Sequence, residues 1–158
     1  MKVALPTALL IFFLDQLIKR WALARLELGA PVPVLDDIFH LTLVLNPGVA
    51  FGFLSTVEPA WRWLVGFLSL VALAVLGSLA VRLLPDGNWL TAAALGMIFG
   101  GAVGNLLDRV RFGAVVDFLD FHWRGYHWPA FNLADSGITV GVAVLVFHFL
   151  VLRPRGAS

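Results

Sequence analysis

Acidic residues that could carry out acid–base chemistry interrupt a chain that is otherwise strongly apolar. Asp117 lies between Val116 and Phe118, and Asp135 follows Asn132 by three residues. Two converging carboxylates can share one proton, so that one acts as an acid while the other acts as a base. Such a pair can activate water for peptide hydrolysis without a metal ion or a cysteine. A simpler interpretation of Asp135 is a first-turn acid in a helix that Asn132 caps, and both interpretations stay open.

The other reactive residue types fit enzymatic chemistry less well. The chain has no cysteine, and no histidine stands in a convincing arrangement with a serine. His40, His122 and His127 could bind zinc, but the spacing of helical zinc-peptidase motifs is missing. His148 lies in an apolar run and is interpreted as a structural residue. We therefore expect chemistry that uses no metal ion and no cofactor.

Ionisable residues inside apolar segments form a second group, because burying them is costly unless they have a partner or a role. Asp15 and Lys19 are four residues apart and share a helix face, which permits either a local ion pair or a place in a site. Asn105 and Asp108 also share a face, and Arg109 follows them. A helix C-terminus accounts for Arg109 but disfavours Asp108. We therefore expect Asp108 to have a partner, which Arg109 can supply.

The composition indicates that these polar residues belong to a membrane protein. The 158 residues are 60% hydrophobic and 13% charged, whereas about 25% of the residues in a soluble domain are charged. The formal charge of +1 argues against a nucleic-acid-binding protein. Thirteen Phe and six Trp in a chain of low charge exclude intrinsic disorder. The length allows one domain, which we expect to cover residues 1–158.

Four apolar runs are each about as long as a membrane-spanning helix, which needs roughly 20 residues. The predicted helices are 3–23, 61–84, 88–107 and 136–152. The first run could instead be a signal peptide after Lys2, but charged residues interrupt it and no small-residue cleavage site follows. The predicted fold class is therefore an all-α membrane protein with four transmembrane helices and a small β-like extramembrane segment.

Regularly spaced glycines mark two of these helices. Gly96, Gly100 and Gly104 recur every four residues, and so do Gly137 and Gly141. Stripes of this kind let membrane helices approach one another closely. The chain lacks the lysine-containing motif of a phosphate-binding loop, so the glycines predict helix packing rather than nucleotide binding.

Two longer segments, 24–60 and 108–135, are expected together on the face opposite both termini. Residues 38–45 form the β-like run, which ends before Asn46 and Gly48 in an Asn-Pro-Gly sequence. A positive-inside count would put the long segments in the cytoplasm. Several of their cations have acidic neighbours, however, so the charge count alone leaves the orientation open.

Five motifs, in this order, resemble the bacterial lipoprotein signal peptidases, which are the type II signal peptidases. The motifs are Asp15-Gln16-Leu17-Ile18-Lys19, Asn46-Pro47-Gly48-Val49-Ala50-Phe51, Gly100-Gly101-Ala102-Val103-Gly104-Asn105-Leu106-Leu107-Asp108-Arg109, Val115-Val116-Asp117-Phe118 and Phe131-Asn132-Leu133-Ala134-Asp135. Each motif is weak alone, but together they span nearly the whole chain. The polar motif positions match the family's pattern, whereas the loop 120–130 is individual to this chain.

The resemblance implies an intramembrane aspartyl endopeptidase of the bacterial inner membrane, with both termini cytoplasmic and the active site near the outer face. It would remove the signal peptide from diacylglyceryl-modified prolipoproteins, cutting before the lipid-modified cysteine. The implied partners are this substrate, membrane lipid and the cyclic peptide inhibitor globomycin, whereas no nucleic acid or oligomer is implied. By motif match, Asp117 and Asp135 would be the catalytic pair. The implied binding or supporting residues are Asp15, Lys19, Asn46, Gly48, Asn105, Asp108, Arg109 and Asn132.

Two other classes of function fit the residues if the resemblance is set aside. A small proton-coupled transporter would use Asp15, Lys19, Asp108 and Asp117 as relay groups, but it would need polar residues throughout the membrane depth. A membrane adaptor would use the aromatic residues of the long segments to bind a partner. That hypothesis leaves the carboxylates and asparagines near the helix ends without a role.

Overall fold

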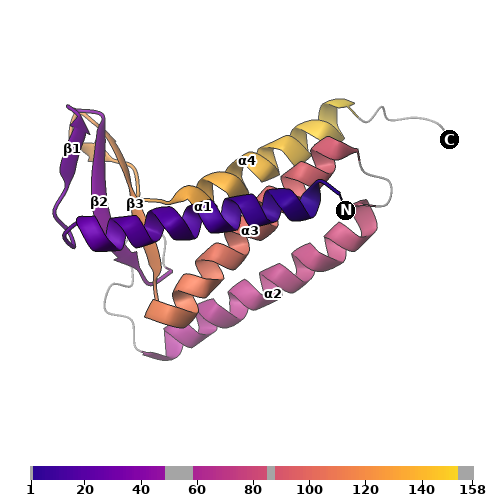
Figure 1. Ribbon diagram of the computed structural model, residues 1–158, viewed down its shortest axis with the longest axis horizontal. Coiled ribbons are helices and arrows are strands. Elements are labelled where there is room, and N and C mark those ends of the chain that lie inside the picture. Colours follow the sequence, from indigo (N-terminus) through magenta and orange to yellow (C-terminus); the bar gives the residue numbers. More distant parts are fainter. Residues whose placement is uncertain (1, 49–58, 85–87, 153–158) are drawn as a thin grey trace.

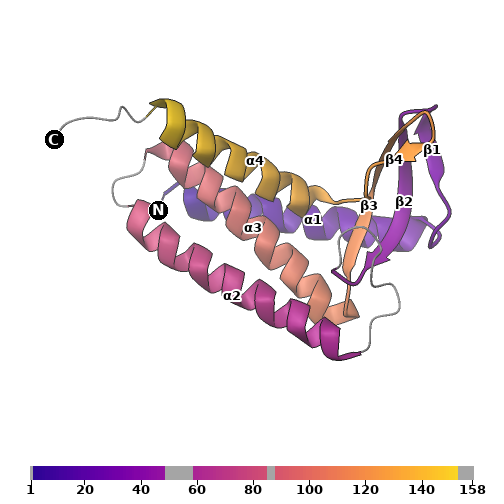
Figure 2. The ribbon, with the colours of Figure 1, turned by 180° about the vertical axis from the view of Figure 1, so that it is seen from behind.

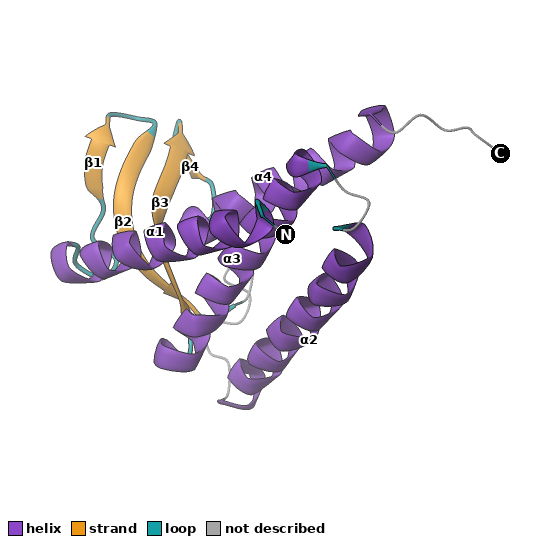
Figure 3. Cartoon of the chain, turned by 45° about the vertical axis from the view of Figure 1, so that its right-hand side comes forward, coloured by secondary structure: helices purple, strands orange, loops and turns teal. Residues whose placement is uncertain are grey.

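Four helices and one small sheet form the chain in a computed structural model that describes residues 2–48, 59–84 and 88–152. The helices are α1 (Ala4–Arg25), α2 (Pro59–Leu83), α3 (Trp89–Phe112) and α4 (Leu133–Phe147), which continues into the π-helical turn η2 (His148–Leu152). The strands are β1 (Val32–Leu35), β2 (Phe39–Asn46), β3 (Val115–Trp123) and β4 (Tyr126–His127). They lie side by side in the order β1-β2-β3-β4, each antiparallel to its neighbour (Figure 3).

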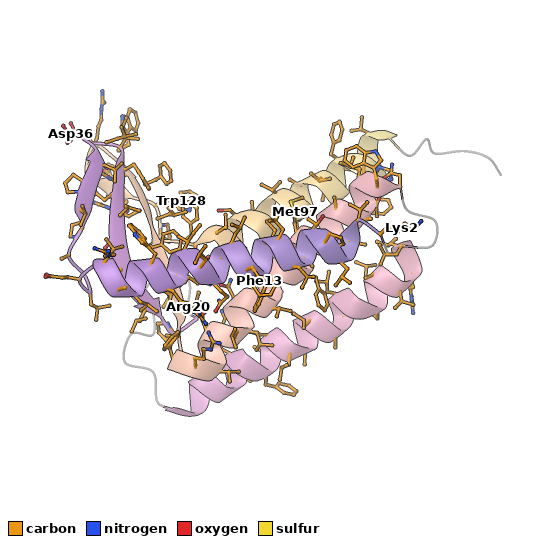
Figure 4. All side chains as sticks on the ribbon, in the orientation of Figure 1. Lys2, Phe13, Arg20, Asp36, Met97 and Trp128 are labelled. Atoms are coloured by element: carbon orange, nitrogen blue, oxygen red, sulfur yellow. The ribbon has the colours of Figure 1, made fainter. Side chains whose placement is uncertain are left out.

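The helices lie alongside one another, and the sheet is at one end of them (Figures 1 and 2). The start of α1 and the end of α4 lie at the opposite end from the sheet. Figure 4 shows this separation in single residues, with Lys2 at the helical end and Asp36 at the tip of the sheet. The strands come from the two long segments that connect α1 to α2 and α3 to α4, so both segments meet at the same end of the molecule.

Three of the described helices are long and apolar enough to cross a membrane. They are Leu64–Leu83, Trp89–Phe112 and Leu133–Val151. α1 is not among them, because its apolar run is interrupted by Asp15, Lys19 and Arg20 and ends at Arg25. The prediction of a mostly helical chain with long apolar helices and a small sheet is therefore confirmed, while the fourth span and the position of the sheet outside the membrane stay predictions.

Several polar side chains are deeply buried, whereas many large apolar side chains of the helices face outward. The most deeply buried large side chains are Lys19, Val116, Asn132, Thr91, Asp15, Asp108 and Asp117, and all but one of these are polar. Large apolar side chains on the helices are exposed, among them Phe13, Phe67 and Leu150, with 61–73% of their surface accessible. This distribution reverses the pattern of a soluble domain and suits helices surrounded by lipid.

The glycine stripes bring α1 and α4 into contact with α3, as their spacing predicts. A Cβ atom at Gly96 or Gly100 would clash with the backbone carbonyl of Ala4 or Ala8 in α1. A Cβ at Gly141 of α4 would lie 2.7 Å from the carbonyl oxygen of Ala94 in α3. Close backbone approach of this kind is what small residues permit in membrane helices. The core of the helical part therefore depends on α3, which contacts the three other helices.

Two helix boundaries beside charged residues differ by three residues or more from those predicted from the sequence. α3 continues to Phe112 instead of ending at residue 107, and Gly113 then ends it with a φ angle of 68°. α4 begins at Leu133 instead of residue 136. Both differences arise because charged residues suggested the end of a span, whereas Asp108 and Asp135 have hydrogen-bond partners inside the fold. Charge alone does not end a helix when the charged groups are paired.

The sheet is also larger than the β-like run at 38–45 that the sequence suggests. β2 pairs with β3 from Phe39↔Phe121 to Asn46↔Val115, and a bulge between Leu41 and Val44 shifts the register. One sheet face packs against α1 through a core of Ala22, Leu43, Val116 and Phe118. The sequence does not predict β3, because a strand that is buried on both faces lacks the alternation of apolar and polar residues. Nearly all of its residues from 115 to 120 are buried beside β2.

Candidate active site

Asp117 lies on β3, with its carboxylate held by two asparagine side chains. It is paired with Val44 of β2, and only 1% of its surface is accessible. Asn132 Nδ2 donates a 2.7 Å hydrogen bond to Oδ1, and Asn46 Nδ2 donates a 3.0 Å hydrogen bond to Oδ2. The strand therefore presents a buried carboxylate in which both oxygens have a neutral donor.

Asn46 is itself oriented by the turn that follows β2. The backbone N–H of Gly48 donates a 3.0 Å hydrogen bond to Asn46 Oδ1, which leaves Nδ2 free to donate to Asp117. Gly48 has a φ angle of 98°, a conformation that side-chain-bearing residues rarely adopt. A Cβ at this position would also come within 2.6 Å of Val65 Cγ1. The Asn-Pro-Gly sequence thus fixes the orientation of one donor to Asp117, while residues 49–51 of the same motif lie outside the described residues.

Asp135 lies at the N-terminus of α4, where it forms a capping box with Asn132. The Asp135 N–H donates to Asn132 Oδ1 at 2.9 Å, and the Asn132 N–H donates to Asp135 Oδ2 at 3.2 Å. The other carboxylate oxygen, Oδ1, accepts a 2.8 Å hydrogen bond from Asn105 Nδ2. The capping interpretation of Asp135 is therefore confirmed by these contacts, while its place in a catalytic pair stays a prediction.

Two amide side chains connect the two carboxylates. Asn132 Nδ2 contacts both Asp117 Oδ1 and, at 3.1 Å, Asn105 Oδ1, while Asn105 Nδ2 donates to Asp135. The path from Asp117 to Asp135 thus runs through side chains of α4 and α3. The negative charge of Asp135 also acts on Asp117 and contributes to raising its pKa. β3, α3 and the start of α4 therefore bring the two acids to one place.

A buried network around Lys19 lies directly behind these amides. Its ammonium is 2.8 Å from Asp15 Oδ2 and 2.7 Å from Asp108 Oδ2, and it donates a 2.9 Å hydrogen bond to Asn105 Oδ1. Lys19, Asp15 and Asp108 are at most 2% exposed. The predicted pair of Asp15 and Lys19 is therefore present, but it extends across to α3.

The same network reaches the backbone of the elements that carry the catalytic candidates. Asp15 Oδ1 accepts a 2.9 Å hydrogen bond from the N–H of Ala134 in α4. Asp108 Oδ2 accepts a longer one, 3.3 Å, from the N–H of Val116 in β3. These backbone contacts fix the residues that immediately precede Asp117 and Asp135. The buried carboxylates of α1 and α3 thus position the two acids without touching them.

Arg109 differs from its expected role as the partner of Asp108. The Asp108 carboxylate binds Lys19 and Gln16 instead, with Gln16 Nε2 3.0 Å from Oδ1. Arg109 Nη1 donates a 3.3 Å hydrogen bond to the backbone oxygen of Asn105. Its positive charge acts on Asp135, Asp117 and Asp108. The extra turns of α3 explain the difference, because Arg109 and Asp108 point to different sides of a continuing helix.

Gln16 is a site residue that the sequence reasoning did not single out. Its Nε2 lies 3.0 Å from Asp108 Oδ1 and 3.3 Å from Asp15 Oδ2, and its Oε1 accepts a 3.1 Å hydrogen bond from Arg111 Nη1. It therefore connects the buried acids with the positive charge of Arg111. The available signal was an uncharged polar side chain next to Asp15 inside an apolar run.

The environment of Asp117 keeps its carboxyl protonated to unusually high pH. Burial is the largest cause, and together with the charge of Asp135 it raises the pKa of Asp117 from its ordinary value of 3.8 to about 7. The hydrogen bonds from Asn46 and Asn132 and the charge of Lys19 act in the opposite direction. Asp135 sits in the first turn of α4, where the helix dipole favours its anion. The structure therefore favours the protonated form of Asp117.

Comparison with known proteins decides which class of protein carries this arrangement. The family described as signal peptidase (SPase) II, Peptidase_A8, matches residues 7–151. The chain belongs to the signal peptidase II family. Its members are aspartic-type peptidases, which excludes the transporter and adaptor hypotheses for this chain and agrees with its two linked acids.

Relatives cover almost the whole chain. The lipoprotein signal peptidase of Geobacter sulfurreducens is 48% identical over 146 residues, which are 91% of this chain and 89% of the relative. The lipoprotein signal peptidase of Shewanella halifaxensis is 44% identical over 142 residues, with coverage of 90% and 82%. A solved structure described as a bacterial membrane enzyme has a TM-score of 0.78 and 28% identity, covering 96% of this chain and 94% of its own. The chain is therefore a multi-pass bacterial membrane protein of this family.

Proposed function

We propose that this protein removes the signal peptide from diacylglyceryl-modified prolipoproteins, with Asp117 and Asp135 as the catalytic pair. The cut lies before the lipid-modified cysteine. The family and the names of the relatives support the substrate class. One observation carries the residue assignment: Asp117 and Asp135 are joined through Asn132 and Asn105, and the charge of Asp135 acts on Asp117.

In this mechanism Asp117 holds the shared proton and Asp135 is ionised. Asp135 takes a proton from a water molecule as the water oxygen attacks the scissile carbonyl carbon. Asp117 gives its hydrogen bond, and then its proton, to the carbonyl oxygen. When the tetrahedral intermediate collapses, the C–N bond breaks and the proton held by Asp135 passes to the leaving amine, while the oxygen returns its proton to Asp117. The raised pKa of Asp117 supports its role as the acid, since an acid must be protonated near neutral pH.

The surrounding residues position the pair and set its charge. Asn46, Asn132 and Gly48 orient the Asp117 carboxyl, and Asn105 orients Asp135. Lys19 compensates the negative charges of two further acids, and Arg109 adds a positive charge near the pair. The supporting set is Asp15, Lys19, Asn46, Gly48, Asn105, Asp108, Arg109 and Asn132. Because Asn46 and Asn132 already bind Asp117, we assign them to the acid rather than to the substrate backbone.

Membrane lipid and the lipid part of the substrate are the next proposed partners. A cavity of about 430 Å³ opens beside the buried network, between α1 and α3. Its lining combines the polar side chains of Gln16, Arg20 and Arg111 with the apolar ones of Phe12, Phe13, Leu17 and Leu107. Figure 4 shows Phe13 and Arg20 on α1. A wall with both cations and aromatic rings suits a lipid at the depth of the headgroups. Globomycin, a cyclic peptide, is the proposed inhibitor of the site.

The proposed topology has four spans in one integral-membrane domain of the bacterial inner membrane. α1 is the fourth span, and its buried polar residues Asp15, Gln16 and Lys19 face α3 and α4 rather than lipid. Both termini are cytoplasmic, and the sheet and the catalytic pair lie near the outer face. The common position of the α1 start and the α4 end, opposite the sheet, supports this topology (Figure 1).

Cleavage of a purified diacylated prolipoprotein by the purified protein tests this function. Asp117→Asn and Asp135→Asn should each lower the rate by about 100-fold to 10,000-fold, the usual contribution of a general acid or base. Both variants should keep a cooperative melting transition in detergent. A chelator should leave the wild-type rate unchanged, because the mechanism uses no metal ion.

Asp36→Asn is the matched control, since Asp36 is exposed at the tip of the sheet, away from the helices (Figure 4). This variant should cleave at the wild-type rate. Full activity in either Asp117→Asn or Asp135→Asn would refute the catalytic pair. Loss of wild-type activity in chelator at a temperature where the protein stays folded, restored by zinc, would refute the metal-free mechanism.

A further inference from the structure

Three histidines and an aspartate gather on one face of the sheet, outside the candidate active site. The register puts His40 of β2 opposite Asp120 of β3, and His127 of β4 opposite His122 of β3. Asp120 and His122 are two residues apart, so they point to the same face of the strand. Asp117 is three residues from Asp120 and therefore points to the other face. The pleat of β3 separates this cluster from the catalytic candidates.

The contacts within the cluster bring metal-binding atoms close together. One donor atom from each of His40, Asp120 and His122 lies within 4.8 Å of the other two. The ring centroids of His40 and His122 are 4.0 Å apart. In the part of the chain that the structure describes, the Nδ1 atoms of both rings are buried and make no hydrogen bond. Buried polar atoms usually have a partner. Two buried nitrogen atoms without a hydrogen bond, close to the carboxylate of Asp120, therefore indicate a site for a ligand.

We propose that His40, Asp120 and His122 form a binding site for a divalent transition-metal ion, with zinc as the best match. Two imidazoles and one carboxylate are ligands that zinc prefers, whereas magnesium and calcium prefer oxygen alone. Zinc–ligand distances of about 2.0–2.1 Å put tetrahedral donor atoms about 3.3 Å apart. Donor atoms that already lie within 4.8 Å of one another reach this spacing through small side-chain rotations.

His127 completes the site by holding the aspartate. Its Nδ1 lies 2.9 Å from Asp120 Oδ1 and 3.0 Å from Oδ2. With Nδ1–H donating to the carboxylate, His127 orients Asp120 as outer partners of metal ligands commonly do. Asp120 is 8% exposed, so little water surrounds its carboxylate. Its negative charge would partly neutralise the positive charge of a bound metal ion.

The metal ion would stabilise the sheet rather than take part in peptide cleavage. Its ligands lie on β2 and β3, and His127 extends the connection to β4, whose two residues pair with β3. An ion that binds the folded chain raises its melting temperature. The site faces away from Asp117, so binding should leave the cleavage rate unchanged. This inference therefore stands apart from the catalytic proposal, and either can fail without the other.

Zinc titration of the metal-free protein, purified without a histidine tag, tests the site. The chain has four histidines and no cysteine, so His148 in η2 supplies a matched control. Wild type and His148→Ala should bind one Zn²⁺ per chain, and zinc should raise their melting temperatures. His127→Ala should weaken binding by about 10-fold to 100-fold, as loss of an outer partner does. His40→Ala and His122→Ala, which lose a ligand, should weaken it by at least about 100-fold.

Three further measurements separate a specific site from surface binding or misfolding. Melting curves in the absence of zinc identify any variant that fails to fold. Wild-type affinity should be lower in acidic solution than at neutral pH, because protonated imidazoles do not bind metal. Mg²⁺ and Ca²⁺ should not raise the melting temperature. Equal zinc affinity in wild type, His40→Ala and His122→Ala, or a pH-independent affinity, would overturn the proposal.

Discussion

The ammonium group of Lys19 donates a 2.9 Å hydrogen bond to Oδ1 of Asn105. This bond fixes the orientation of the Asn105 amide, because an oxygen that accepts from lysine leaves the Nδ2 group to face Asp135. Through Asn105, Lys19 thereby helps to orient the carboxylate of Asp135, with which it makes no direct hydrogen bond. The buried ion network and the catalytic pair are consequently a single connected arrangement.

Lys19→Met should therefore lower both stability and activity. The substitution removes the only partner charge that contacts both Asp15 and Asp108 in the described part of the chain. Breaking a buried ion pair typically costs about 3–5 kcal/mol, because the remaining charge is left uncompensated. The melting temperature in detergent and the cleavage rate measure the two effects.

Lys2→Met supplies the control for this change, since Lys2 is exposed at the other end of the molecule (Figure 4). It should match the wild type in both measurements. Adding Asp108→Asn to Lys19→Met should recover part of the lost stability, since it removes one of the two unpaired charges. A Lys19→Met variant as stable and active as Lys2→Met would contradict the connected arrangement.

The raised pKa of Asp117 predicts a specific dependence of stability on pH. Because the folded-state pKa is about 7 and the ordinary value is 3.8, the folded protein retains a proton that the unfolded chain releases in between. This stabilisation is complete below about pH 4 and is lost as the pH rises to about 7. Asp117→Asn, which is always neutral, should lack this component.

The measurement is the melting temperature of wild type and Asp117→Asn across this pH range. The difference between the two proteins should grow in favour of the variant as the pH rises. The wild-type cleavage rate should also decline above about pH 7, where Asp117 loses the proton that it donates. Parallel stability profiles for the two proteins would show that Asp117 does not carry the proton.

Gly100→Ala should destabilise the helical core. An added Cβ would clash with the backbone of Ala8 in α1, where no flexible side chain can move aside. Overpacking of this kind usually costs about 1–3 kcal/mol. Gly77→Ala in α2 is the matched control, because no atom lies within 4 Å of its added Cβ. Alanine is the better helix former by about 1 kcal/mol, so this control should melt at or above the wild-type temperature.

Labelling of single cysteines tests the proposed topology, and the absence of native cysteines makes each introduced thiol unique. Asp36→Cys should react with a membrane-impermeant maleimide in intact spheroplasts. Lys2→Cys should react only after the membrane is permeabilised. Both residues are exposed, so a difference in reactivity reports the side of the membrane. Reaction of Lys2→Cys alone in intact spheroplasts would reverse the orientation and favour the positive-inside count.

Much of the architecture follows from local patterns in the sequence. Long apolar runs predict the helices, the Asn-Pro-Gly sequence predicts the end of β2, and glycines four residues apart predict where α3 packs. These features depend on residues close to one another in the chain, and their physical basis is the helical period and the restricted backbone of the turn. The sequence likewise predicts the pairing of Asp15 with Lys19, since a helix places residues four apart on one face.

Only the tertiary structure decided which distant groups share a partner. Asp15 accepts a hydrogen bond from Ala134, 119 residues away, and Lys19 reaches Asn105 across 86 residues. The partner of Asp108 is Lys19 rather than the adjacent Arg109, because the continuing α3 turns Arg109 to another side. The register of β2 against β3, shifted by a bulge, also puts His40 opposite Asp120. Such contacts depend on how whole elements pack, because the energy of a buried charge or amide is set by the groups that surround it in space.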